Sequence, residues 1–175
     1  TDFGGYCPDD YGGATGTYMS ARYALAHSVN IPAVKILNEL GLARAADYLG
    51  KMQLYTDEDD LSLALALGGM RRGFTLPALA DAYAVFANCG KYAASATIAR
   101  VEDDRGRTLY THSPVQDRVF SEDTAAIMND MLQSAVTEGT AKKLRTLPFP
   151  VCAKTGTAEG DKGNTDAYCI SYTRD

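Results

Sequence analysis

Hydrophobic residues show no regular spacing over residues 1–16, which are rich in glycine, aspartate and tyrosine. We predict an irregular lead-in here, because such a composition favours turns. From Thr17 to Val29 the apolar residues recur at the spacing of an amphipathic helix. Thr17 or Ser20 is suited to cap that helix, since a hydroxyl at the N-cap accepts a hydrogen bond from a free backbone N–H.

Pro32 interrupts the helical pattern. A proline inside a helix costs about 3 kcal/mol but is tolerated in the first turn, and it disfavours helical geometry in the preceding residue. We therefore predict a helix that stops before Ile31 and a second that starts near Pro32 and ends at Gly41. The break holds Ser28 and Asn30 on a short, rigid connection, where either side chain is also suited simply to cap the second helix.

Helical and ambiguous patterns alternate through the middle of the chain. A helix is predicted over 43–49, and the acidic run 57–60 is interpreted as a solvated face or a helix start. Leucines alternate with small residues over 61–67, which suits a strand or a helix. Thr75 is predicted to cap an amphipathic helix. Its predicted buried stripe consists of Leu76, Leu79, Ala80, Tyr83, Phe86 and Ala87.

The second half of the chain begins with the pattern of a β-hairpin over 96–112, with its turn at 103–106. Ser121, followed by two acidic residues, then opens a helix that runs to Gly139.

Two further strands are predicted over 151–157 and 166–170, on either side of a polar turn. A glycine weakens a strand unless another group must approach the backbone closely. An ammonium group, hydroxyls and free N–H groups on one strand suit an anionic, peptide-like ligand. Taken alone, the pattern also suits a surface strand with an exposed lysine. The residues concerned are Lys154, Thr155, Gly156 and Thr157.

Composition restricts the class of protein. At 175 residues with 46% hydrophobic side chains, the chain is expected to form one domain or a large part of one. The net charge of -5 provides no basic footprint, so no nucleic-acid partner is predicted. No apolar run is long enough to span a bilayer.

No metal site or cofactor is predicted. His27 and His112 are isolated, which favours packing or surface roles. Cys152 and Cys169 lie on the two predicted strands and could be cross-strand neighbours, although buried free thiols are favoured. The cysteines lack the close pairing of a zinc or redox site: they are Cys7, Cys89, Cys152 and Cys169.

Several segments together resemble the transpeptidase domain of class A penicillin-binding proteins, the bifunctional cell-wall synthases. Motifs of the Ser-x-Asn and Lys-Thr-Gly type are typical of penicillin-binding proteins and related β-lactamases. Here they are Ser28-Val29-Asn30 and Lys154-Thr155-Gly156. The similarity extends over nearly the whole chain in family order, through 24–34, 65–75, 82–88, 131–140, 154–157 and 166–168.

The resemblance implies an α+β fold of the penicillin-binding protein transpeptidase and serine β-lactamase type, with a helical lobe and an antiparallel sheet. It implies a D,D-transpeptidase that cross-links peptidoglycan stem peptides ending in D-Ala-D-Ala through a serine acyl-enzyme. β-Lactams imitate that substrate. Ser28 is then expected to relay a proton to the leaving amine, Lys154 to hold Ser28 in the right electrostatic state, and Asn30 to orient the catalytic lysine and substrate.

The resemblance also implies roles for the strand. Thr155 and Thr157 are expected to bind the terminal carboxylate, and Gly156 is expected to admit the substrate backbone. The N–H of Thr157 is expected to supply half of an oxyanion hole.

One departure from the family is decisive. The family's nucleophile belongs to a Ser-x-x-Lys motif, and no serine in this chain has lysine three positions later. We therefore expect residues 1–175 to be part of a transpeptidase domain that lacks this upstream segment and the C-terminal strand and helix. Such a chain is expected to be inactive by itself, and its exposed strand edges are expected to favour pairing between copies.

Other functions stay open. One is a non-catalytic module that binds D-Ala-D-Ala or β-lactams, and another is a serine β-lactamase or D,D-carboxypeptidase. The implied partners are the stem peptide and β-lactam antibiotics. The expected location is the extracytoplasmic face of a bacterial membrane, with anchoring only through other parts of a longer protein.

Overall fold

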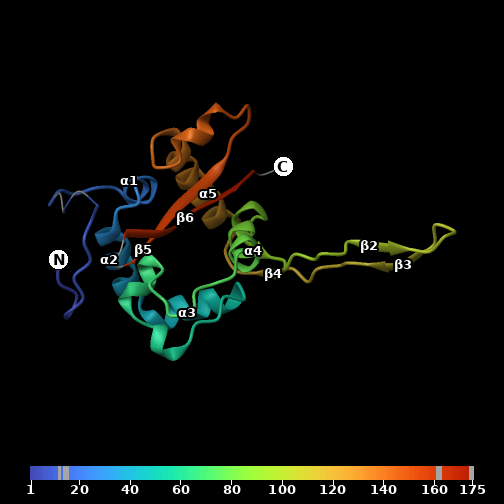
Figure 1. Cartoon of the computed structure of the whole chain (residues 1–175), viewed down its shortest axis with the longest axis horizontal. Coiled ribbons are helices and arrows are strands. Elements are labelled where there is room, and N and C mark those ends of the chain that lie inside the picture. Colours follow the sequence, from blue (N-terminus) through green and yellow to red (C-terminus); the bar gives the residue numbers. More distant parts are fainter. Residues whose placement is uncertain (12, 14–15, 161–162, 174–175) are drawn as a thin grey trace.

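The computed structural model describes residues 1–11, 13, 16–160 and 163–173. A long two-stranded hairpin packs against α5 (Glu122–Thr137), with the N-terminal helices toward one end of it, and a second hairpin projects from the body as an arm (Figure 1). The α-helices are α1 (Ala21–Ala26), α2 (Asn30–Leu40), α3 (Leu42–Lys51), α4 (Leu76–Ala87) and α5 (Glu122–Thr137). The described residues also form three short 3-10 helices: η1 (Glu58–Asp60), η2 (Leu63–Leu67) and η3 (Lys142–Thr146).

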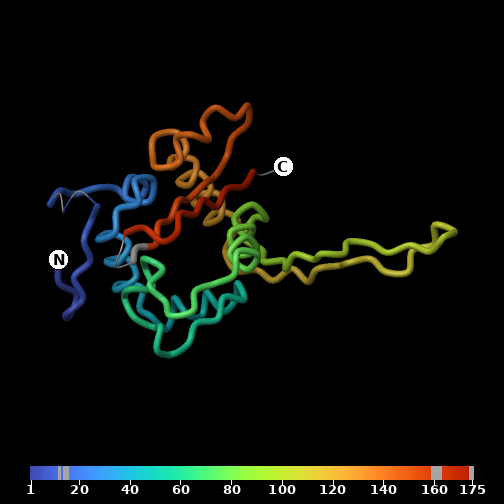
Figure 2. The backbone as a smooth tube through the Cα atoms, viewed as in Figure 1, coloured from blue at the N-terminus to red at the C-terminus, as the bar shows by residue number. Residues whose placement is uncertain are grey.

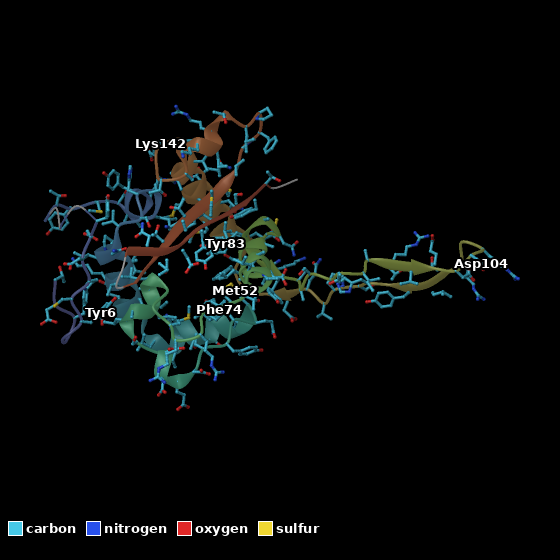
Figure 3. All side chains as sticks on the ribbon, in the orientation of Figure 1. Tyr6, Met52, Phe74, Tyr83, Asp104 and Lys142 are labelled. Atoms are coloured by element: carbon cyan, nitrogen blue, oxygen red, sulfur yellow. The ribbon has the colours of Figure 1, made fainter. Side chains whose placement is uncertain are left out.

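The strands of the described residues form three antiparallel pairs. The pairs are β1 (Lys91–Tyr92) with β4 (Asp117–Arg118), β2 (Arg100–Glu102) with β3 (Thr108–Thr111), and β5 (Cys152–Gly160) with β6 (Gly163–Tyr172). Together with the helices, these pairs confirm the predicted α+β class. The β2–β3 hairpin is the arm, and Asp104 lies at its tip, as predicted (Figure 3).

Local hydrogen bonds begin three helices at the predicted residues. The hydroxyls of Ser20, Thr75 and Ser121 each accept a backbone N–H from the first turn of α1, α4 and α5. Gly41 ends α2, again as predicted, with a φ of 84°. These caps need only a hydroxyl or a glycine at the right position, so they are encoded locally.

The start of the second helix differs from the prediction. It begins at Asn30, so Ile31 is helical and Pro32 lies within the first turn. Neither Ser28 nor Asn30 caps it, since the N-cap is Val29, which makes no side-chain cap bond. The missing cap comes instead from outside the helix, as described below.

Segment 61–67, left open between strand and helix, forms the 3-10 helix η2. The prediction that the acidic run 57–60 forms a solvated face is partly wrong. Asp60 is only 7% exposed, and its carboxylate accepts the backbone N–H of Arg71 at 3.0 Å. A buried carboxylate needs such a donor to offset its lost hydration.

The predicted buried stripe of α4 is also partly wrong. Leu76 is 62% exposed, Ala80 is exposed, and the buried residues are Ala82 and Val85. Hydrophobicity is nearly continuous along α4, so the sequence alone did not determine which side would be covered. Tertiary packing buries the Val85 side against Tyr92 and Val119, with Tyr48, Met52 and Phe120 at its border.

A second apolar cluster lies where β5 and η3 pack on α5. It consists of Val136, Ala141, Val151 and Ala153, with Leu144 against it. Cys152 is buried as predicted, whereas Cys169 is exposed, and the register pairs Thr155 rather than Cys152 with Cys169. No helix within the described residues combines the length and hydrophobicity that a membrane crossing requires.

Candidate functional site

Ser28 lies in the turn between α1 and α2, and its φ of 57° is left-handed. For a residue with a Cβ this conformation is uncommon and costs about 1–3 kcal/mol. Two backbone hydrogen bonds maintain it, from the N–H of Ser28 to the Leu25 carbonyl and from that of Val29 to the Ala24 carbonyl. The turn leaves the Ser28 side chain exposed.

Lys154 lies on β5 and reaches this turn. Its Nζ donates to Ser28 Oγ at 2.7 Å and to the backbone carbonyl of Thr155, also at 2.7 Å. Burial lowers the pKa of the Lys154 ammonium group from its ordinary value. The predicted pair of chemical groups is therefore in contact, although 126 positions separate the two residues. The N-terminal helices do lie beside the C-terminal hairpin in the chain trace (Figure 2).

Asn30 faces the same cleft, but its amide group is bound elsewhere. Asn30 Nδ2 donates to the backbone carbonyl of Asp9 at 2.6 Å. The Asp10 carboxylate accepts the backbone N–H groups of Asn30 and Ile31, at 2.8 and 2.9 Å. Asp10 thus caps α2 from a distant part of the sequence and complements the positive end of the helix.

The remaining predicted site residues lie next to Lys154 on β5. Thr155, Gly156 and Thr157 all line the cleft. A Cβ added to Gly156 would meet no atom within 4 Å, so the glycine leaves open space beside the strand. Among the described residues β5 pairs only with β6, so no further strand lies along its other edge.

The cleft has a volume of about 510 Å³, within the usual range for small-ligand sites. Its lining includes polar and apolar side chains, among them Tyr83 of α4, which is labelled in Figure 3. The polar part consists of Ser28, Asn30, Lys154, Thr155, Gly156 and Thr157. The apolar part includes Leu25, Ile36, Leu67, Tyr83, Met128 and Met131.

Three residues in contact with this site are absent from the predicted set. Asp9 and Asp10 hold Asn30 in place, and Thr140 Oγ1 lies 2.6 Å from Thr155 Oγ1. The lead-in reads as irregular sequence, and nothing in it signals these contacts. Thr140 lies in segment 131–140, which resembles the family, and this resemblance is the one sequence feature that could have indicated it.

Chemically, the site offers a hydroxyl in contact with a lysine of lowered pKa, next to hydroxyls and an open strand edge. The hydroxyl and lysine can pass a proton, and the ammonium group and threonines can bind a carboxylate. No group of three metal-ligating side chains occurs in the part of the chain that the structure describes. Fold and site together define an α+β domain with a serine–lysine pair beside one strand of an antiparallel hairpin.

Comparison with known proteins specifies the family. Residues 3–174 match the penicillin binding protein transpeptidase domain. Penicillin-binding protein 1F of Bacillus subtilis is 36% identical over 174 residues, which cover 98% of this chain and 24% of that protein. The chain therefore belongs to the penicillin-binding protein transpeptidase family, and it spans about a quarter of the length of such relatives.

Solved structures confirm the fold. The D,D-transpeptidase domain of a peptidoglycan glycosyltransferase from Eggerthella lenta has a TM-score of 0.79 at 22% identity. It covers 98% of this chain, which corresponds to 49% of that structure. Penicillin-binding protein A from M. tuberculosis, solved as an imipenem acyl-enzyme complex, has a TM-score of 0.76 at 21% identity, and the match covers 94% of this chain and 42% of that one. The resemblance noted from the motifs is thus confirmed.

Proposed function

We propose that this chain is part of a D,D-transpeptidase that cross-links peptidoglycan stem peptides through a serine acyl-enzyme. The observation that carries the proposal is the 2.7 Å contact between Lys154 Nζ and Ser28 Oγ. It lies in a cleft that also contains Thr155, Gly156 and Thr157. Membership of the transpeptidase family supports the same activity.

In the proposed reaction, a nucleophilic serine attacks the carbonyl carbon of the penultimate D-alanine. The new C–O bond forms as the C–N bond to the last D-alanine breaks. The proton of the nucleophile passes to its lysine base and from there to Ser28, which gives a proton to the departing amine. The ammonium group of Lys154 stabilises the charge that develops on the Ser28 oxygen during this relay. An acceptor amine then attacks the ester, and the serine leaves as the new peptide bond forms.

Ligand binding is assigned to the strand and to Asn30. The hydroxyls of Thr155 and Thr157 bind the terminal carboxylate, and the backbone N–H of Thr157 donates to the developing oxyanion. Gly156 admits the peptide backbone, for which the open space beside it leaves room. Asn30 Nδ2 donates one of its two N–H groups to the Asp9 carbonyl. To contact the substrate and the catalytic lysine, Asn30 uses its second N–H or first breaks the bond to Asp9.

We place the nucleophile and its lysine base outside these 175 residues, because no Ser-x-x-Lys motif occurs among them. The proposed partners are stem peptides ending in D-Ala-D-Ala and β-lactams. The imipenem acyl-enzyme of the M. tuberculosis relative supports the second. Peptidoglycan lies outside the cytoplasmic membrane, so we infer an extracytoplasmic location for the longer, membrane-anchored protein.

The test is the intact mass after incubation with benzylpenicillin. It compares the 175-residue chain with a polypeptide extended upstream through the adjoining gene sequence. We expect no adduct on the chain itself and one covalent adduct on the extended polypeptide. Lys154→Ala in the extended polypeptide should slow adduct formation, and absence of any adduct from the unchanged extended polypeptide would contradict the proposal.

A second candidate is a binding module that recognises D-Ala-D-Ala or β-lactams without acylation. It would use the Lys154 strand, whose Thr155, Gly156 and Thr157 line the cleft. The upstream gene sequence separates the two functions, since an in-frame Ser-x-x-Lys supports the enzyme and its absence supports the module. A third class, β-lactamase or D,D-carboxypeptidase, would hydrolyse the adduct or release D-alanine without an acceptor amine.

Self-association is a separate proposal. Within the described residues, β6 pairs with β5 alone, and such an edge is a template for pairing with another chain. We expect the 175-residue chain to form dimers through this edge at high concentration. Sedimentation that gives only a monomeric mass would count against it.

A further inference from the structure

The turn that follows α5 contacts both halves of the site. Thr140 donates its backbone N–H to the carbonyl of Ala26 at 3.0 Å, two residues before Ser28. Its side-chain Oγ1 lies 2.6 Å from Oγ1 of Thr155, the residue after Lys154. One residue is thereby bonded to the two chain segments that carry the Ser28–Lys154 pair.

The contact with α1 is close enough to require a glycine. A Cβ on Gly139 would lie 2.1 Å from the Ala26 carbonyl oxygen and 2.7 Å from the Cα of Ala135. Arg22 joins the same two helices, since its Nη1 donates to the Asp130 carbonyl and to Ser134 Oγ, both at 3.0 Å. The backbone of Thr140 is therefore held firmly against the end of α1.

A threonine hydroxyl has one proton and two acceptor lone pairs. When the Thr140 hydroxyl donates to Thr155 Oγ1, the proton of Thr155 must point in another direction. It is then available to an anion at the strand edge. Hydrogen bonds in a chain polarise one another, so the outer bond also becomes stronger.

We propose that Thr140 is a positioning residue that orients the Thr155 hydroxyl toward the carboxylate of the ligand. The inference rests on the proposed function, because it requires an anionic ligand at Thr155. Thr140 itself touches no ligand in this mechanism. Its role is to make the site prefer a peptide with a free C-terminal carboxylate over one without it.

The test uses the full chain and two probes, N-acetyl-D-Ala-D-Ala and its C-terminal carboxamide. Amide chemical-shift titrations give the two dissociation constants, and their ratio measures the preference for the carboxylate. We expect Thr140→Val to reduce that preference by about two- to tenfold, the value of one hydrogen bond. Thr140→Ser, which keeps the hydroxyl, should restore it.

Thr137→Val is the matched control, because it makes the same change at an exposed position at the end of α5, just before the turn that contains Thr140. Thr140→Ala is a second variant that removes the hydroxyl while adding no bulk. In a Thr155→Val background the effect of Thr140→Val should disappear, since the hydroxyl that it orients is gone.

The outcomes are distinct. An unchanged acid-to-amide ratio in Thr140→Val, or equal weakening of both probes, would overturn the role of Thr140. A wild-type chain that binds both probes equally, or neither, would overturn the proposed function and this role with it. Persistence of the Thr140→Val effect in the Thr155→Val background would likewise overturn the inference.

Discussion

Replacement of Gly139 by alanine should destabilise this protein more than any loss of an exposed side chain would. The new Cβ would lie 2.1 Å from the Ala26 carbonyl oxygen. Real Cβ atoms essentially never approach another heavy atom to less than 3.0 Å. The neighbouring atoms are backbone, so no side-chain rotation relieves the clash. The turn and the end of α1 must therefore separate by about 1 Å.

The size of the effect follows from three terms. Overpacking of a close backbone contact costs about 1–3 kcal/mol. Separation also strains the hydrogen bond from Thr140 to the same carbonyl, which contributes about 0.5–1.5 kcal/mol. Alanine lowers the conformational entropy of the unfolded chain relative to glycine, which stabilises the folded state by about 0.4–1 kcal/mol and offsets part of this loss. We expect the free energy of unfolding to fall by about 2–3 kcal/mol.

Urea unfolding followed by circular dichroism measures this change, and thermal unfolding should show a Tm lower by about 4–12 °C. Gly50→Ala is the matched control. Gly50 lies inside α3, and a Cβ there would meet no atom within 4 Å. That change should stabilise the chain by about 0.5–1 kcal/mol. A Gly139→Ala protein as stable as the wild type would refute the close packing of the turn on α1.

Three further predictions concern the site and its supports. The side-chain NMR resonances of Lys154 should titrate at lower pH than those of exposed lysines, because burial lowers its pKa from 10.5; titration together with the others would contradict this. Since the unfolded state then binds the proton more tightly, the contribution of Lys154 to stability should rise with pH between its lowered pKa and 10.5. Tyr172→Phe should cost about 1–3 kcal/mol in urea unfolding, because Tyr172 Oη donates to Asn129 Oδ1 at 2.6 Å. Burial raises the pKa of Tyr172, so the wild type should also lose stability above pH 10.0, where the unfolded phenol ionises first, and the Phe variant should lose less. Asp10→Ala should cost about 0.5–2 kcal/mol through the lost cap of α2, while Asp9→Ala, which keeps the backbone carbonyl, should cost almost nothing, and equal stability of the two variants would refute the capping role.

Locally encoded features were predictable from the sequence. The hydroxyls of Ser20, Thr75 and Ser121 identify helix starts, because each bonds an N–H within its own first turn. Pro32 correctly predicted a break in the helical pattern, although the second helix begins two residues earlier, at Asn30. Each of these signals depends on atoms a few residues apart.

Burial and distant contacts were harder to predict. The side of α4 that is buried is the side that packs against Tyr92 and Val119, and their positions depend on the tertiary fold. The prediction that Leu76 lies in the core was therefore wrong. The cap of α2 comes from Asp10, twenty positions before Asn30 in the chain, and no local pattern records that pairing.

The site shows the same division. Residue types, spacing and family resemblance predicted Ser28, Asn30 and the Lys154 strand as site residues from the sequence alone. Their chemistry depends on a contact between Ser28 and Lys154 over 126 positions, which no short segment can specify. The Gly139–Thr140 turn makes that contact part of a packed unit. Hydrogen bonds within one turn are determined by the residues of that turn, whereas proximity between distant segments is determined by how all the elements share one core.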